Sequence, residues 1–175
     1  MNKELKRRKS KIKKQFQASE SFTVSFICSG NIIRSPYAHI LFFHMIEGDS
    51  NLKNRIKVES GGVEYRNSSI SYESCEILLR KGVSEKEVFD FKPRYYPDYP
   101  DMFKMIDLIL VMEKNHIKYL PRSVHDRAFL LLEFTLGISE NVPDPFFDPP
   151  FERAYKMIDK SLEYLLEFFK DITKN

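Results

Sequence analysis

The stretch that most constrains this chain is residues 22–36, where an apolar run gives way to a small polar loop and then a helix start. Residues 22–27 are rich in β-forming side chains, and the run ends at Cys28. Ser35 suits the N-cap of a helix and Pro36 its first position, because the N–H that proline lacks is unpaired there. The pattern predicts a strand, a tight loop and a helix, with loop N–H groups and the positive helix end converging on one anion site.

Cys28 and Arg34 are the residues of this loop that can carry chemistry. The field that holds an anion also favours the thiolate form of a cysteine at the rim of the site. The planar guanidinium of Arg34 binds two oxygens of a tetrahedral oxyanion. Together they indicate attack by sulfur on a bound phosphoryl group. A bare Cys-x5-Arg also fits a structural cysteine and a surface ion pair, but the preceding strand, Gly30, Asn31 and the helix start favour the functional interpretation.

Residues 28–36 resemble the signature of the low-molecular-weight protein tyrosine phosphatases, C-x-G-N-x-x-R-S-P. A second block, residues 142–147, is similar to the Asp-Pro-aromatic-aromatic loop that supplies the general acid in that family, which places the acid at Asp144. Residues 60–62 and 107–112 also resemble family segments. The similarity spans roughly residues 22–172 and leaves out the first twenty residues.

The resemblance implies a role for each residue of the site. Cys28 attacks phosphorus to give a cysteinyl-phosphate, and Asp144 protonates the departing oxygen and then activates water. Arg34 and backbone N–H groups hold the phosphate charge, so neither a metal nor a cofactor is expected. Ser35 is expected to hydrogen-bond the thiolate, and Asn31 and Ser60 to brace the loop. The residues expected to bind phosphate or substrate are Ser29, Gly30, Asn31, Ile32, Ile33, Ser35, Ser60, Tyr65, Phe146 and Phe147.

Phosphotyrosine proteins are the substrates that these residues favour, with a phosphate or sulfate ion expected in the loop. Phe146 and Phe147 are expected to form the walls of a slot in which an aryl phosphate stacks, with Tyr65 as a further wall. Relatives that act on phosphoarginine tend to carry Thr where Ile32 stands. A branched apolar side chain there favours an aryl ester over the more polar guanidinium phosphate.

Three other functions stay open. A phosphoarginine phosphatase would use the same loop and acid. A thioredoxin-coupled arsenate reductase shares the fold but needs two further cysteines, and Cys75 is the only other cysteine in the chain. A non-catalytic phosphate-binding module is disfavoured by the joint presence of Cys28, Arg34 and Asp144.

The rest of the chain predicts an α/β fold. Strands and helices alternate, which indicates a four-stranded parallel sheet with helices on both faces, a three-layer sandwich of the flavodoxin-like, Rossmann-like type. Sites in such sheets lie beyond the carboxyl ends of the strands. Residues 89–105 are rich in Pro and Tyr and predict a surface loop that leads into a short helix. The expected strands are residues 22–27, 56–59, 106–112 and 128–134, and the expected helices are residues 36–47, 71–81, 113–120 and the segment after Pro149.

Residues 1–20 differ from the rest in charge. They hold eight Lys or Arg against two Glu, a net +6, while the whole chain is +3, so residues 21–175 carry −3. We expect a flexible basic tail over residues 1–20 and a single phosphatase domain over residues 21–175. The tail is a candidate tether to an acidic partner or anionic lipid. Nucleic acid is disfavoured as a partner because Phe16 is the only aromatic residue of the tail that could stack on bases.

The composition predicts a cytoplasmic location. Two cysteines give no disulfide framework and fit a reducing compartment. No apolar run approaches the ~20 residues of a membrane span, and no apolar core follows the basic N-terminus as it would in a secretory signal.

Two departures from the family pattern stand out. The family commonly has a second cysteine where Ile33 stands, which can form a protective disulfide with the nucleophile. The usual His of its H-x-x-R segment is Phe91 here, ahead of Arg94. This second departure predicts that one hydrogen bond supporting the loop network is missing.

The first departure predicts sensitivity to peroxide. With no adjacent thiol to trap a sulfenic acid, Cys28 should pass to irreversible oxidation states more readily than it would with a neighbouring cysteine. Activity after prolonged peroxide treatment should therefore be only partly restored by dithiothreitol, and an Ile33→Cys variant should recover more. Full recovery of the unmodified protein would contradict this prediction.

Overall fold

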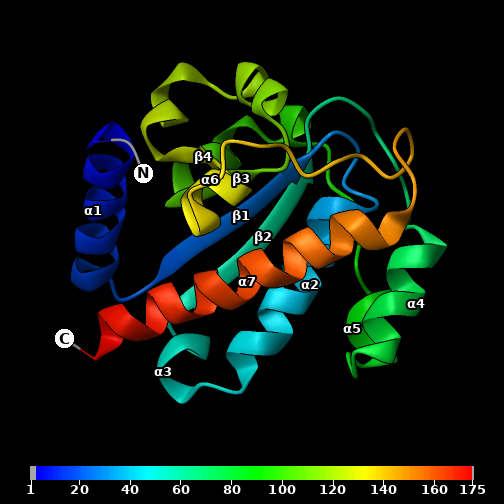
Figure 1. Cartoon of the computed structure of the whole chain (residues 1–175), viewed down its shortest axis with the longest axis horizontal. Helices are drawn as coiled ribbons and strands as arrows, with labels where there is room; N and C mark the ends of the chain where they lie inside the picture. Colours follow the sequence, from blue (N-terminus) through cyan, green and yellow to red (C-terminus); the bar gives the residue numbers. More distant parts are fainter. Residues whose placement is uncertain (1–2, 175) are drawn as a thin grey trace.

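A computed structural model describes residues 3–174 of the chain. Four parallel strands form one sheet in the order β2-β1-β3-β4, with the connections passing over its faces (Figure 1). Val24 of the central strand β1 lies opposite Val58 on one side and Leu108 on the other. The strands are β1 (Phe22–Cys28), β2 (Ile56–Gly62), β3 (Leu108–Val111) and β4 (Ala128–Leu130).

Each face of the sheet has its own core. Phe26 points into the core beneath α2 (Arg34–Glu47) and α7 (Phe151–Thr173), while its neighbour Ile27 points into a second core on the opposite face. Short 3₁₀ helices, rather than α-helices, cover that second face. The predicted three-layer α/β fold is confirmed. The other elements are α3 (Ser50–Lys53), α4 (Tyr72–Arg80), α5 (Glu85–Phe89), η1 (Tyr96–Asp98), η2 (Pro100–Met105), η3 (Lys114–Tyr119), η4 (Arg122–Arg127) and α6 (Leu131–Leu136).

Several predicted boundaries differ from the structure. The strand expected over residues 128–134 ends at Leu130, and the same apolar run continues as the short helix α6, which ends at Gly137 with a left-handed φ of 72°. A continuous apolar run does not distinguish a buried strand from a buried helix turn. Ser35 is not an N-cap: α2 begins at Arg34, so Ser35 and Pro36 both lie within its first turn.

The prediction of a flexible tail over residues 1–20 is wrong for residues 3–18, which form helix α1 (Lys3–Ala18). Leu5, Ile12 and Phe16 are buried, and their spacing places them on one face of the helix. The ring of Phe16 lies 5.3 Å from that of Phe22 and 4.8 Å from that of Phe169. These apolar residues are interleaved with lysines. The high positive charge of the segment therefore makes its apolar face difficult to recognise in the sequence.

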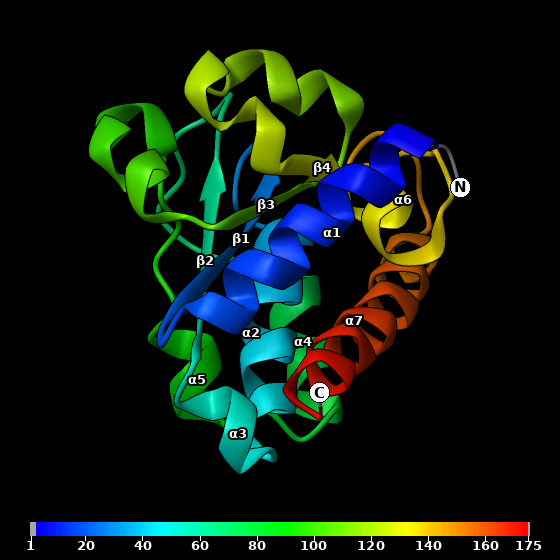
Figure 2. The ribbon, with the colours of Figure 1, turned by 90° about the vertical axis from the view of Figure 1, so that its left-hand side faces the viewer.

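Helix α1 also makes polar contacts with the amino ends of the strands, the sheet edge opposite Cys28 (Figure 2). Arg8 donates to the carbonyl of His125 in η4 at 2.9 Å and to that of Ala128, the first residue of β4, at 2.6 Å. Gln15 donates to Asp107, just before β3, at 2.6 Å. Arg55, just before β2, donates to the carbonyl of Phe16 at 2.8 Å. The helix therefore links the starts of several strands.

No helix within residues 3–174 combines the length and the apolar character needed to cross a membrane.

Helix α1 is predicted to contribute substantially to stability. Phe16→Ala removes a fully buried ring and should lower the free energy of unfolding by about 3 kcal/mol, measured by urea unfolding. Lys14→Ala, on the exposed face of the same helix, is the matched control and should change it by less than about 0.5 kcal/mol. Equal stabilities of the two variants would show that α1 is not anchored through this ring.

Candidate active site

The loop of residues 28–34 closes around the sulfur of Cys28 at the carboxyl end of β1. The backbone N–H of Asn31 donates to Sγ of Cys28 at 3.2 Å, with Asn31 in a left-handed conformation at φ 55°. A Cβ on Gly62 would lie 2.8 Å from the backbone of Gly30, and one on Gly30 would lie 2.8 Å from the side chain of Asn67. The missing side chains of these glycines let β2 and the following segment approach the loop.

A buried polar network supports the loop from behind. Oγ of Ser35 lies 2.9 Å from Sγ of Cys28. The side-chain amide of Asn31 donates to Oγ of Ser35 at 2.8 Å and to Oγ of Ser60 at 3.0 Å. All three polar side chains are buried, so these bonds fix the direction of each group. Ser35 thus lies against the sulfur, and Asn31 connects Ser35 with Ser60 behind the loop.

Arg34 is 1% exposed and is neutralised by two carboxylates from distant parts of the chain. Its Nη1 donates to Glu113 and, at 3.1 Å, to the carbonyl of Val142. Its Nη2 donates to Oδ2 of Asp144 at 2.7 Å. A buried guanidinium without such partners would be costly, so Arg34 holds the 142–147 loop against the 28–34 loop.

The predicted site residues meet around one cavity of about 250 Å³. The exceptions are Asn31, Ser35 and Ser60, which belong to the buried network behind the loop. Asn67 joins the cavity lining and was not predicted. The residues of the prediction that line the cavity are Cys28, Ser29, Gly30, Ile32, Ile33, Arg34, Tyr65, Asp144, Phe146 and Phe147.

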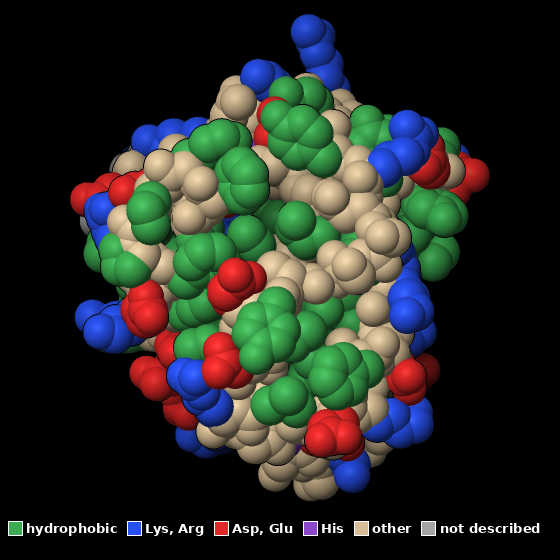
Figure 3. Space-filling model, turned by 90° about the vertical axis from the view of Figure 1, so that its right-hand side faces the viewer, with side chains coloured by type: hydrophobic (Ala, Val, Ile, Leu, Met, Phe, Trp, Pro, Cys, Tyr) green, Lys and Arg blue, Asp and Glu red, His purple; other side chains and the backbone are tan. Residues whose placement is uncertain are grey.

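The aromatic rings form an exposed rim rather than the walls of a closed slot. Phe146 is 73% exposed and Phe147 76%, with their ring centroids 5.0 Å apart, and Tyr65 is 60% exposed. The side of the molecule with α4 and the loop before α7 carries many hydrophobic side chains among acidic ones (Figure 3). The backbone N–H of Phe146 donates to Oδ1 of Asp144 at 3.2 Å, which ties the rim to the carboxylate.

Glu113 and His116 are site residues that the sequence interpretation missed. His116 is 1% exposed; its Nδ1 accepts the backbone N–H of Glu113 at 3.2 Å, so we assign the ring proton to Nε2, which donates to Oγ of Ser29 at 3.0 Å. Burial, together with the positive charge of Arg34, lowers the pKa of His116 to about 4. The signal was available, because Glu113 directly follows a predicted strand at its carboxyl end, where sites of this fold gather, and His116 lies three residues further on.

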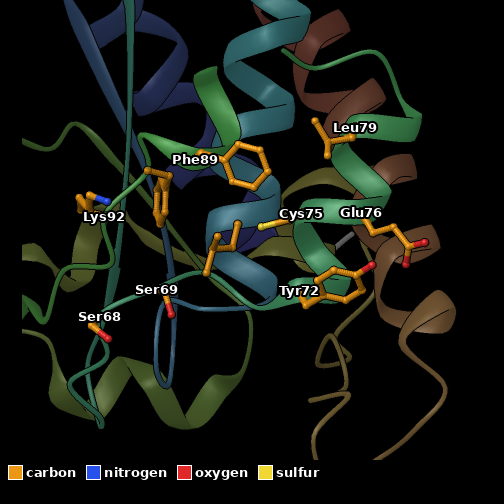
Figure 4. A pocket seen from close by; sticks show the side chains of 10 residues that line it. Ser68, Ser69, Tyr72, Cys75, Glu76, Leu79, Phe89 and Lys92 are labelled. Atoms are coloured by element: carbon orange, nitrogen blue, oxygen red, sulfur yellow. The ribbon is translucent and has the colours of Figure 1, made fainter. Parts of the chain in front are cut away.

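A second cavity of about 370 Å³ lies beside α4, and the thiol of Cys75 lies at its wall together with Tyr72 and Phe89 (Figure 4). Burial raises the pKa of Cys75, which fits the interpretation of an inert thiol. Ser71, which stands between the lining residues Ile70 and Tyr72, donates its backbone N–H to the carbonyl of Ile32 in the 28–34 loop at 2.8 Å.

Within residues 3–174, no three His, Cys, Asp or Glu side chains are gathered in a way that could hold a metal ion.

Comparisons with known proteins define the family. The profile described as low molecular weight phosphotyrosine protein phosphatase matches residues 23–175. The low molecular weight protein-tyrosine-phosphatase PtpA of Staphylococcus saprophyticus is 32% identical over 151 residues, which cover 83% of this chain and 92% of that protein. PtpA of Staphylococcus aureus strain MRSA252 is 30% identical over 149 residues, with the same coverage of 83% and 92%. The chain therefore belongs to the low molecular weight phosphotyrosine protein phosphatase family.

Solved structures agree with this assignment. The crystal structure of YfkJ from Bacillus subtilis superposes with a TM-score of 0.75 at 26% identity, over 88% of this chain and 98% of that one. The YwlE arginine phosphatase from Geobacillus stearothermophilus gives a TM-score of 0.68 at 19% identity, over 87% and 94%, which supports the fold alone. Helix α1 precedes the residues matched by the family profile.

The buried histidines predict how stability depends on pH. The pKa is about 4 for His116 and about 3 for His39 in the folded protein, against about 6.5 in an unfolded chain, because burial disfavours the charged ring. The unfolded state therefore binds more protons below pH ~6.5, and the free energy of unfolding should fall as the pH drops from ~6.5 towards 4, by at most ~1.4 kcal/mol per pH unit for each histidine. Urea unfolding at several pH values measures this slope. His116→Gln should reduce it, and an unchanged slope would contradict the prediction.

Proposed function

We propose that this protein hydrolyses phosphotyrosine in proteins, with Cys28 as nucleophile, Arg34 as phosphate ligand and Asp144 as general acid and base. The observation that carries the proposal is the convergence on one cavity of Cys28 and Arg34 with Asp144, which stands more than a hundred residues later in the sequence. Family membership supports the same reaction class, a phosphoric monoester hydrolase.

The first step transfers the phosphoryl group to sulfur. The thiolate of Cys28 forms a bond to phosphorus as the bond to the ester oxygen breaks, and the proton of the Asp144 carboxyl passes to that oxygen. Arg34 and the N–H groups of the 28–34 loop stabilise the charge on the remaining oxygens. The oxygen that leaves is the phenol of the tyrosine.

The second step restores the enzyme. Water attacks phosphorus while the carboxylate of Asp144 takes its proton, and the phosphorus–sulfur bond breaks to release phosphate. Ser35 assists this departure. Its Oγ already accepts a bond from the amide of Asn31, so its own proton is free to stabilise the thiolate of Cys28.

The 28–34 loop is also proposed to hold inorganic phosphate or sulfate, which would then inhibit competitively. Ile32 lines the cavity and presents an apolar branched side chain next to the aromatic rim, which favours an aryl ester over phosphoarginine. The two free cysteines are consistent with the cytoplasm as the site of action. The exposed lysines of α1, such as Lys3, Lys6 and Lys14, are the surface proposed to meet an acidic partner.

Removing the acid should affect substrates according to their leaving groups. Asp144→Ala should lower kcat by about 10²- to 10⁴-fold on a phosphotyrosine peptide and by much less on p-nitrophenyl phosphate, because p-nitrophenolate departs without a proton. Asp148→Ala is the control, since Asp148 lies a few residues along the same loop, is half exposed and pairs with Arg153. Equal losses on both substrates would argue against a general acid at Asp144.

The nucleophile and the substrate class are tested together. Cys28→Ser should abolish metal-independent hydrolysis of p-nitrophenyl phosphate, and the wild-type kcat/KM should be higher for phosphotyrosine than for phosphoarginine peptides. The reverse preference would make it an arginine phosphatase. Arsenate reduction with thioredoxin alone would indicate the reductase, and phosphate binding without turnover in either protein would indicate a binding module.

A further inference from the structure

The polar network behind the loop extends one residue further, to His39 on α2. Nδ1 of His39 lies 3.0 Å from Oγ of Ser60, which in turn accepts from the amide of Asn31. His39 stands one helical turn after Ser35, so both side chains reach the same network. A continuous path of hydrogen bonds therefore runs from His39 through Ser60, Asn31 and Ser35 to Sγ of Cys28.

The direction of every bond on this path follows from its donors and acceptors. The side-chain oxygen of Asn31 accepts the backbone N–H of Arg94 at 2.9 Å, so its NH₂ group has both protons available for Ser35 and Ser60. Each hydroxyl thus accepts one bond and has one proton to donate. Ser35 gives its proton to Cys28. Ser60 has Nδ1 of His39 as its acceptor.

The surroundings of His39 keep Nδ1 free to accept. Burial, with the positive charge of Arg94, lowers the pKa of His39 to about 3, so the ring is neutral at physiological pH. The ring of Phe91 packs edge-on against it, with centroids 5.5 Å apart. The charged groups that line the small opening beside the ring are Asp90, Lys92 and Arg94.

We propose that His39 is a positioning residue for the nucleophile. By accepting the proton of Ser60, it keeps Ser60 available as an acceptor for Asn31. The amide of Asn31 is then held so that Ser35 presents its proton to the sulfur of Cys28. This inference rests on the proposed function, in which that sulfur acts as a thiolate.

The network also contains a histidine that the expectation drawn from Phe91 did not include. The sequence predicted that the network lacks one supporting hydrogen bond because Phe91 replaces a histidine. In the structure the network does have a histidine, His39, which comes from α2 and contacts Ser60. Phe91 serves as the packing partner of that histidine.

Two measurements distinguish a positioning role of His39 from a general structural role. His39→Leu removes the acceptor, and we expect the pH midpoint for alkylation of Cys28 by iodoacetate to rise, together with a fall in kcat of about five- to tenfold. His39→Asn retains an acceptor near the position of Nδ1 and should restore most of both values. A Cys75→Ala background restricts alkylation to Cys28, because these are the only cysteines of the chain.

His44→Leu is the matched control. It removes a histidine from the same helix, with a 40% exposed side chain and no contact with the network, and should leave both readouts unchanged. If His39→Leu does not fold, His39→Gln, whose acceptor lies one bond further out, takes its place as the disrupting variant.

The results for these variants decide whether His39 positions the nucleophile. A wild-type midpoint and kcat in His39→Leu, or equal damage in the Leu and Asn variants, would overturn the proposal. A double-mutant cycle with Ser60→Ala should show non-additive effects, and full additivity would also overturn it. Alkylation needs no substrate, so a protein without phosphatase activity but with the expected midpoint shift would refute the proposed function and leave the role of His39 intact.

Discussion

The buried charge of Arg34 is the constraint on which the candidate site depends. A guanidinium that is 1% exposed must be neutralised and hydrogen-bonded, and Glu113 and Asp144 perform that task. Glu113 follows β3, and Asp144 belongs to the 142–147 loop, so one ion-pair cluster draws three distant segments together. The aromatic rim is attached to the same cluster through the backbone of Phe146.

The amino edge of the sheet carries contacts that hold helix α1, whereas the carboxyl edge carries the candidate site. At the amino edge, α1 is held by Phe16 in the core and by Arg8 and Gln15 at the starts of the strands. At the carboxyl edge, glycines and buried polar groups replace apolar packing around the 28–34 loop. Gly62 shows the cost of that arrangement: any side chain there would collide with the backbone of Gly30. An additional helix at the amino edge thus stabilises the fold without contacting the site.

The sequence was sufficient to predict those features whose residues are close together in the chain. Residues 22–36 combine strand, loop and helix signals in one stretch, so the position of Cys28 followed directly, and the 142–147 loop was found by its resemblance to a family motif. Residues 3–18 were misjudged because the stripe of Leu5, Ile12 and Phe16 is interleaved with lysines. The role of His39 could not be found from sequence, since it depends on which way Ser60 and Asn31 point, and that is fixed by the backbone of Arg94.

The ion pairs around Arg34 rearrange when a phosphate enters the loop in the proposed reaction. One guanidinium and two carboxylates give this cluster a net charge of −1, and neither His116 nor His39 adds a positive charge, because both rings are neutral near pH 7. A phosphate dianion that enters the 28–34 loop competes with Asp144 for Nη2 of Arg34. In the proposed reaction Glu113 then keeps Arg34 in place through Nη1, while Asp144 is released from Nη2 to face the leaving oxygen.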